Sequence, residues 1–393
     1  MAKRWRNVVI LAAIESVAGT EQAISAATDG IMAENAQPGF GDSTQQTNEH
    51  TGSLDGSDDV PIGGPFTFTF STYVKGSGTP GTAPVIGKLL RACSWTQTDT
   101  DVAIPTEAGG TIAGTSSGDL IAPTPFAGAD DDYKGMPILL SNVPSNPTFA
   151  MVKSFVDASN VLAVSETFSP AVGPTTAIQI PINTMYKPHS DTPSSLTFHV
   201  YVDGIKHVVI GARGNFTLTM VSGRTMMFNW TFTGLLADGA RTDESNPTPT
   251  YPDAAVPKLT WRNDNYNGSF TVDGVRIGIS QLTFENGNAV SADPDPNKPT
   301  GFDIGDITGR TMVATIDPLL ASIATRDTLT KLQDGTKIAV AAFARRSAGN
   351  SFGILLPDAQ VLSAPYGNRD GRATEQIRLK CTGINAGAYL AFW

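Results

Sequence analysis

The stretch Pro65-Phe66-Thr67-Phe68-Thr69-Phe70-Ser71-Thr72-Tyr73-Val74 alternates strictly between apolar and polar side chains. Successive side chains of a β-strand point to opposite faces, so Phe66, Phe68 and Phe70 share one face and the Thr and Ser side chains share the other. This pattern is typical of a strand that packs one face on a core and exposes the other face to water. It predicts a sheet protein.

Similar runs recur along the chain, and few segments favour a helix. The dipeptide Asp203-Gly204 separates two of the runs and is typical of a two-residue hairpin turn. Only 84–93 and 318–332 carry apolar residues at helical spacing, and Gly335 offers the second one a stop. The fold class predicted is therefore mainly β, with one or two short flanking helices. The strand runs are 66–74, 196–202, 205–210, 216–220, 228–233, 271–279, 281–285, 312–316, 337–344 and 377–382.

Two stretches differ from the rest in composition. Residues 100–190 are rich in Gly, Ser, Thr and Pro around short β runs, which indicates an inserted small β-domain. Residues 237–267 carry several prolines and are typical of a linker. We therefore expect a first β-unit at 1–99 and 191–236, and a second β-unit at 268–393.

A weak internal repeat relates these two units. The strand 66–74 followed by the helix 84–93 is similar to the strand 312–316 followed by the helix 318–332, and Asp29-Gly30 matches Asp273-Gly274. The pattern is compatible with two copies of one β-rich unit, of which the first carries the insertion.

Charge is scarce and unevenly placed in the 393 residues. Charged residues make up 16% and the net charge is -10, which argues against a general nucleic-acid binder because such a protein needs a basic surface. No Lys or Arg occurs from Asn7 to Val74, whereas that segment has nine acids; from residue 300 onward, ten bases face eight acids. This asymmetry fits either a solvated acidic loop or end-to-end complementarity in an assembly.

The apolar run Val8–Ile14 follows a basic tip, a combination that a secretory signal shares with a β-strand. The run is short and ends at Glu15, so we interpret it as a strand. Since no other apolar run approaches the ~18 residues of a membrane span, we expect no membrane partner. Two cysteines in a chain of this length form no disulfide framework, so Cys93 and Cys381 are interpreted as buried free thiols.

Two short motifs match catalytic or nucleotide-binding patterns. The segment 114–118 reads G-x-S-x-G, but it lies in a loop rather than between a strand and a helix. The segment 76–81 reads G-x-G-x-x-G, but no buried parallel strand with a terminal acid follows it. No nucleophile, base and orienting group occur together, so we expect neither an enzyme nor a cofactor.

Histidines and acidic clusters do not suggest a metal site. His199 and His207 can approach each other across the Asp203-Gly204 turn, but no further ligand lies at metal spacing, so we interpret them as a surface pair. The run Asp130-Asp131-Asp132 lacks the glycine-bearing loop of a calcium hand. We therefore expect no metal ion.

Several segments taken together resemble the major tail tube proteins of long-tailed, non-contractile (siphophage-type) bacteriophages. They span most of the chain outside 100–190. The segments are Ile10 to Thr20; Gly78 to Pro84 followed by Leu89 to Cys93; Tyr201 to Gly204 with Gly211 to Gly214; Phe232 to Leu235; and Tyr366 to Gly371.

The resemblance implies a tail-tube-type β-barrel or sandwich that forms hexameric rings. It implies that these rings stack into a hollow tube in the virion tail, assembled in the cytoplasm of the bacterial host. The implied partners are other copies of the chain and the tape measure, tail terminator and tail tip proteins. DNA is implied to pass through the bore without specific binding. The stretch 100–190 departs from the compact family pattern.

Complementary charges suggest where stacked rings meet. We expect the acidic loop near 40–60 to reach the C-terminal bases of the next ring, because opposite charges steer and fix such contacts. The candidate contacts are Asp42, Glu49, Asp55, Asp58, Asp59, Arg345, Arg346, Arg369 and Arg372.

An alternative function of another class is a carbohydrate- or cell-surface-binding β-sandwich module. The inserted β-domain suits such a module. So do tryptophans on the surface, and four are candidates: Trp5, Trp95, Trp261 and Trp393. A binding module forms a monomer or a small closed oligomer, whereas a tube protein forms rings or filaments.

Overall fold

The computed structural model describes most of the chain. The residues outside the description are 1–2, 5, 40–42, 48, 51, 53, 106–109, 113, 115–116, 122–125, 127, 142–148, 175, 192, 262–267 and 299. Strands dominate, and the two α-helices are short: α1 (Gly87–Ala92) and α2 (Thr328–Asp334). The predicted mainly β class with one or two short helices is confirmed.

Seven strands of the first half form a circuit of antiparallel pairings, in which the chain itself makes the link between β2 and β3. β1 pairs with β15 and with β2; the chain then passes directly from β2 into β3, which pairs with β6. β6 pairs with β17, β17 with β16, and β16 with β15, which returns the circuit to its start. The strands are β1 (Val8–Ile14), β2 (Gly30–Ile31), β3 (Glu34–Gly39), β6 (Phe66–Tyr73), β15 (Leu196–Val202), β16 (Ile205–Val221) and β17 (Met227–Asp243).

Seven strands of the second half repeat this circuit in the same order. β18 pairs with β24 and with β19; the chain then enters β20, which pairs with β23. β23 pairs with β28, β28 with β25, and β25 with β24. The strands are β18 (Ser269–Val272), β19 (Val275–Arg276), β20 (Gln281–Glu285), β23 (Val313–Ile316), β24 (Lys337–Ser347), β25 (Asn350–Ser363) and β28 (Ile377–Cys381).

The segments between these strands match as well. A short helix follows β6 in the first circuit and β23 in the second. A two-stranded hairpin precedes each of these strands: β4 (Ser43–Gln45) with β5 (Val60–Ile62), and β21 (Asn288–Pro294) with β22 (Phe302–Arg310). The last strand, β29 (Tyr389–Phe392), continues β28 along β25, as the long β17 does along β16. The chain thus contains one strand order twice.

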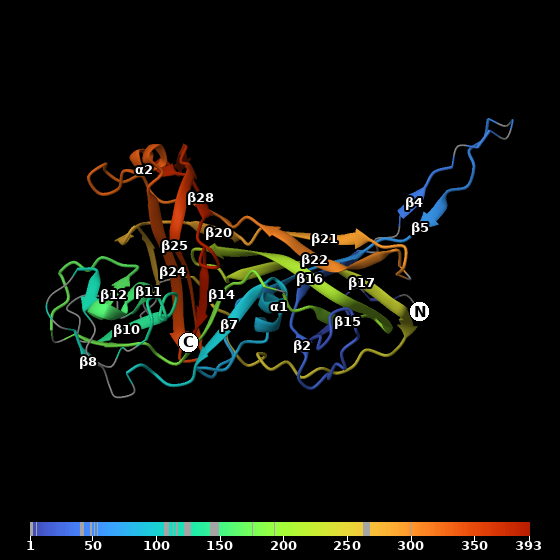
Figure 1. Ribbon diagram of the computed structural model, residues 1–393, viewed down its shortest axis with the longest axis horizontal. Coiled ribbons are helices and arrows are strands. Elements are labelled where there is room, and N and C mark those ends of the chain that lie inside the picture. The colour runs from blue at the N-terminus through green and yellow to red at the C-terminus, as the bar shows by residue number, and fades with distance from the viewer. Residues whose placement is uncertain are drawn as a thin grey trace.

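The two circuits join through a shared strand pairing. The outer end of β16, Thr217–Val221, pairs with β20 of the second circuit. In Figure 1 the long strands β16 and β17 run across the view, whereas β24 and β25 run nearly at right angles to them. The second circuit is therefore rotated relative to the first.

The alternating stretch Phe66–Tyr73 contributes three aromatic rings to the core. Phe66, Phe68 and Phe70 are buried on one face of β6 and contact aromatic rings across the circuit; the Phe70 and Phe232 rings are stacked with centroids 5.9 Å apart. The buried Trp230 donates a hydrogen bond of 2.9 Å from Nε1 to Oγ1 of Thr72. One hydrophobic cluster extends through both circuits, which packs them on a common core.

Residues 110–179 form a separate six-stranded sheet, and its hydrophobic cluster also includes Phe343 and Leu355 of the second circuit. A 3₁₀-helix, Asp157–Ser159, lies between two of its strands. The flanking strands β7 (Trp95–Thr100) and β14 (Asn183–Pro188) pair with each other and belong to the large sheet, so the expected boundaries 100–190 are too wide. The six strands are β8 (Gly110–Thr111), β9 (Asp119–Ile121), β10 (Pro137–Ser141), β11 (Phe149–Val156), β12 (Val161–Val164) and β13 (Ala177–Gln179).

The second predicted helix is wrong over most of its length. The backbone N–H groups of Leu319 and Leu320 donate to carbonyl oxygens of Gly278 and Ala373, so this segment bonds to other parts of the chain. Asp327 caps α2 by accepting a hydrogen bond of 3.0 Å from the Thr330 N–H. The predicted stop at Gly335 is confirmed, and its φ of 70° lies in the left-handed region that glycine favours.

Two further expectations need correction. The predicted linker 237–267 begins too early, because β17 continues to Asp243. The predicted surface pair is wrong, because His199 and His207 are both buried, and His199 pairs with Glu21 over 2.9 Å between Nε2 and Oε1. The strand expected at Val8–Ile14 is confirmed as β1, and both cysteines are confirmed as buried free thiols.

Candidate assembly site

The hairpin of β4 and β5 projects from the body of the molecule as an arm (Figure 1). Its strands pair with each other from Ser43↔Ile62 to Gln45↔Val60, and the described residues show no other strand pairing for them. The side chains of Val60 and Ile62 are 50% and 43% exposed, and Leu54 is fully exposed. An isolated two-stranded hairpin is marginal in water, so this arm needs a surface to lie on.

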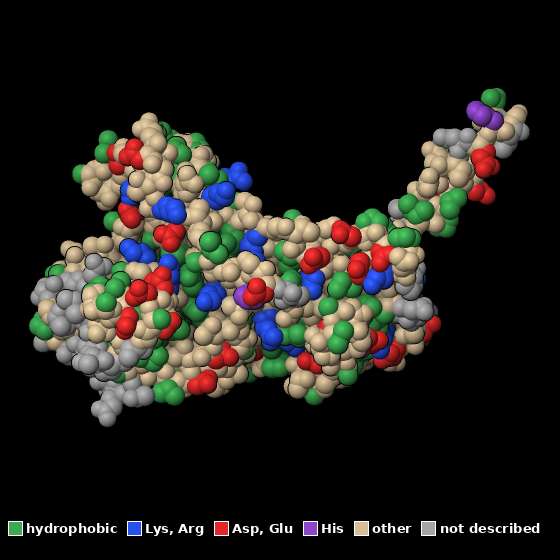
Figure 2. Space-filling view, viewed as in Figure 1, with side chains coloured by type: hydrophobic (Ala, Val, Ile, Leu, Met, Phe, Trp, Pro, Cys, Tyr) green, Lys and Arg blue, Asp and Glu red, His purple; other side chains and the backbone are tan. Residues whose placement is uncertain are grey.

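The arm carries acids and no Lys or Arg. Glu49, Asp55, Asp58 and Asp59 are exposed, whereas Asp42 lies outside the described residues. Within the arm, Thr47 Oγ1 donates a hydrogen bond of 2.8 Å to the Asp58 backbone carbonyl. Figure 2 shows acidic and hydrophobic side chains side by side along the arm. The arm is therefore a negatively charged surface with an apolar component.

The four expected basic contacts lie on the second circuit and its hairpin β26 (Tyr366–Arg369) and β27 (Arg372–Glu375). Arg346 and Arg372 are exposed. Arg345 lies over the ring of Phe149, 4.5 Å from its centroid. Arg369 donates to Asp317, with 2.9 Å between Nη1 and Oδ2. Arg345 and Arg369 thus already have intramolecular partners.

The hairpin β21–β22 occupies the position in the second circuit that the arm occupies in the first. The two connections have nearly the same length, residues 40–65 and 286–312. Unlike the arm, β21–β22 lies across β16 and β17 of the first circuit (Figure 1). Arg213 of β16 donates to Asp306 of β22, with 2.8 Å between Nη1 and Oδ1, and its Nη1 also donates to the Gly305 carbonyl. One matching hairpin is docked and the other is not.

Close backbone packing also fixes the docked hairpin. A Cβ atom at Gly305 would lie 2.4 Å from the carbonyl oxygen of Thr233 on β17, so only glycine allows this approach. Thr233 belongs to the face of β17 opposite the buried Phe232. The hairpin therefore covers the outer face of the first circuit rather than its core.

The outer face at the corresponding place in the second circuit is uncovered. Along β28, Ile377, Leu379 and Cys381 are buried, whereas Arg378 and Lys380 are exposed. Leu362 on the adjacent β25 is 43% exposed. Figure 2 shows basic side chains over the region of β28. We call Leu362, Arg378 and Lys380 the β25–β28 outer face; Arg378 and Lys380 are not among the contacts expected from the sequence.

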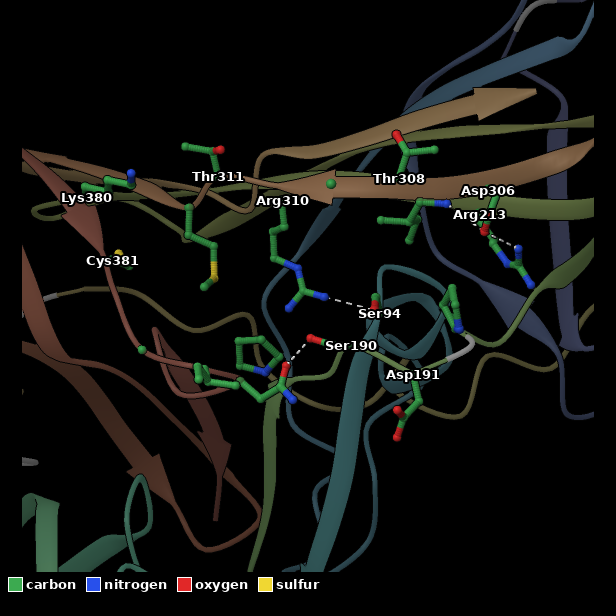
Figure 3. Close-up of a pocket in the computed structure, with 18 residues that line it drawn as sticks. Ser94, Ser190, Asp191, Arg213, Asp306, Thr308, Arg310, Thr311, Lys380 and Cys381 are labelled. Atoms are coloured by element: carbon green, nitrogen blue, oxygen red, sulfur yellow. Dashed lines mark hydrogen bonds and ion pairs between the residues drawn. The ribbon is translucent and has the colours of Figure 1, made fainter. Parts of the chain in front are cut away.

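A polar cleft of about 760 Å³ lies where the two circuits meet (Figure 3). At its wall, Arg310 donates from Nη2 to Ser94 Oγ over 2.9 Å and from Nε to Asn288 Oδ1 over 3.2 Å. Burial lowers the pKa of the Arg310 guanidinium. The bond to Ser94 ties β22 to the segment after α1, whereas the bond to Asn288 stays within the β21–β22 hairpin.

The motif 76–81 serves as a connector between β6 and α1. Gly78 donates its N–H to the carbonyl oxygen of Gly349, at the turn between β24 and β25, over 2.9 Å. A Cβ atom at Gly76 would lie 2.1 Å from the same oxygen. The glycines thus permit close contact between the circuits. Of the motif 114–118, residues 115 and 116 lie outside the described part of the chain.

Three other features considered from the sequence are a metal site, a membrane span and tryptophans at the surface. Among the described residues, no three His, Cys, Asp or Glu side chains lie close enough to hold a metal ion. In the same part of the chain, no helix has the length and apolar character to cross a membrane. The expectation of exposed tryptophans is wrong for Trp95, Trp261 and Trp393, which are all buried; Trp5 lies outside the described residues.

No family model matches the chain, and no curated protein matches it. The arm and the two strand circuits are therefore the features on which a functional assignment rests.

Proposed function

We propose that this protein is a structural virion protein, the major tube protein of a long bacteriophage tail. Copies of the chain assemble into stacked rings with six-fold architecture, and the rings form a hollow tube for the genome. The observation that carries this proposal is the projecting arm. A hairpin that exposes Val60 and Ile62 away from any core is stable only against another molecule.

The charge of the chain supports passage of DNA. A net charge of -10 opposes binding of a polyanion, because phosphate binding depends on Lys and Arg that release counterions. A bore lined with few bases would let the genome slide without adhering. The partners in this role are other copies of the chain, and the tape measure, tail terminator and tail tip proteins at the ends of the tube.

Electron microscopy of the purified protein tests the proposal. Negative stain at high protein concentration should show rings or hollow rods. A variant in which residues 43–62 are replaced by a short Gly-Ser linker should keep the fold, because its core contacts remain, but should form neither. A wild-type protein that stays monomeric across concentration, salt and pH would contradict the proposal.

The alternative, a carbohydrate- or cell-surface-binding β-sandwich module, keeps the inserted β-domain as support but loses the surface tryptophans. Three of the four tryptophans are buried in the hydrophobic clusters.

A further inference from the structure

The repeated circuit supplies a template for a contact between two copies of the chain. Within one chain, the second circuit docks on the first in two ways: β20 pairs with the outer end of β16, and β21–β22 crosses the outer face of β16 and β17. The first circuit has the same two docking elements, β3 and the arm. In the described part of the chain, β3 pairs only with β6, and β4 and β5 pair only with each other.

The second circuit also has the matching receiving surface. β25 and β28 correspond to β16 and β17 in the order of pairings. Their outer face is exposed at Leu362, Arg378 and Lys380, whereas β21–β22 covers the corresponding face of the first circuit. One chain therefore has an unused docking element at one end and an unused receiving surface at the other.

The free edge of β3 supports the same arrangement. An open groove of about 480 Å³ runs beside β2 and β3, lined by Ile31, Met32, Glu34 and Ala36 among others. An edge strand with unpaired N–H and C=O groups is a template for pairing with another chain. A head-to-tail contact of this kind forms a ring when the rotation between neighbours closes.

The chemistry of the two surfaces is complementary. The arm presents Asp58 and Asp59 next to Val60 and Ile62. The β25–β28 outer face presents Arg378 and Lys380 next to Leu362. Opposite charges at the rim and apolar groups at the centre are typical of specific protein interfaces. In the docked hairpin, the pair Arg213–Asp306 has the same polarity: the base is on the circuit and the acid is on the hairpin.

We propose that the arm of one copy lies across the β25–β28 outer face of a second copy in the same ring, as β21–β22 lies across β16 and β17 within the chain. The inference rests on the proposed function, since it assigns one contact of an assembling protein. It differs from a contact between stacked rings, because the intramolecular template places neighbouring circuits side by side.

Zero-length carbodiimide cross-linking of the assembled protein tests the contact. The reagent joins a carboxylate to a lysine amine, and the arm contains no lysine. A mixture of ¹⁴N- and ¹⁵N-labelled chains identifies links between copies by mass spectrometry. The expected product joins Asp58 or Asp59 of one copy to Lys380 of another. Arm peptides linked only to other lysines in assembled protein would overturn the inference.

Charge exchange gives an independent test. We expect D58K/D59K and R378E/K380E each to reduce the assembled fraction about tenfold, and the variant with all four substitutions to regain most of it. K153E, on the insertion, is the matched control and should assemble normally. Circular dichroism and thermal unfolding verify that each variant is folded. If the variant with all four substitutions assembles no better than either double variant, the contact is refuted.

The outcomes separate the two proposals. A wild-type protein that never assembles contradicts the proposed function. A wild-type protein that forms rings or rods, but lacks the Lys380 link and the charge rescue, contradicts only the placement of the arm.

Discussion

Arg213 on β16 and Asp306 on β22 form an ion pair with 2.8 Å between Nη1 and Oδ1, and it joins the two strand circuits (Figure 3). The guanidinium is almost completely buried, whereas the carboxylate is mostly exposed. The β21–β22 hairpin therefore covers the Arg213 guanidinium, and Asp306 of this hairpin balances its charge.

Replacement of Asp306 by Ala should destabilise the protein by about 1–2 kcal/mol, because it leaves a buried guanidinium with fewer acceptors. Chemical denaturation measures the free energy of unfolding. Asp293→Ala, on the partner strand β21, is the matched control and should change it little. Equal effects of the two substitutions would show that the ion pair does not fix the hairpin.

The alternating face of β6 predicts a contrast between neighbouring residues. Phe70→Ala should cost about 3–5 kcal/mol, because it removes a buried ring that stacks on Phe232 and leaves a cavity. Thr69→Ala, on the opposite face, should cost less than about 1 kcal/mol. Urea unfolding of both variants checks the prediction, and similar losses would contradict the assignment of the faces.

Asp253 makes stability depend on pH. Burial raises the pKa of its carboxyl to about 6, although the Val85 N–H, Lys75 and Lys88 oppose this shift. A carboxyl with a raised pKa in the folded state stabilises the fold fully below its unfolded pKa of about 4, and this contribution is lost as the pH rises through 6.

Between pH 4 and pH 7, the wild type should therefore lose about 1–3 kcal/mol relative to Asp253→Asn, which does not titrate. Urea unfolding of both proteins at the two pH values measures this difference. Parallel pH profiles would show that Asp253 titrates normally in the folded protein.

The two thiols should be chemically silent in the folded protein. Burial raises the pKa of Cys381 to about 12 and raises that of Cys93 strongly, and the thiolate is the reactive form. Iodoacetamide at pH 8 should modify neither residue until guanidinium is added. Rapid alkylation of native protein would contradict their burial.

The repeated circuit predicts the composition of a ring. The resemblance implies rings of six chains, whereas six circuits around a bore require only three chains of 41.3 kDa, because each chain contributes two circuits. Native mass spectrometry of rings released from the tube counts the chains. Six chains per ring would show that the two circuits of a chain do not occupy equivalent places.

The sequence predicted the parts of the fold that depend on local pattern. The alternation at Phe66–Phe70 identified a core strand, and Asp29-Gly30 and Asp273-Gly274 marked equivalent places in the two circuits. The prediction of a helix over 318–332 was wrong because the backbone N–H groups of Leu319 and Leu320 donate to distant carbonyl oxygens. No local sequence pattern reveals such bonds. The prediction of exposed tryptophans was wrong for a similar reason, since tertiary packing decides whether these side chains are buried.

The candidate site was predicted in part. Exposure of the arm acids followed from an acidic loop without bases. Arg378 and Lys380 were missed because their importance depends on which face of β28 is outward and on the correspondence of β28 with β17. The near-equal lengths of residues 40–65 and 286–312 were the signal that could have led to them.

A polypeptide that carries the same circuit twice is an already joined pair of building blocks. Association costs translational and rotational freedom at each step, and the covalent connection removes that cost from every second junction. Assembly then needs half as many encounters between free molecules to complete a given length, and the concentration at which growth begins falls accordingly.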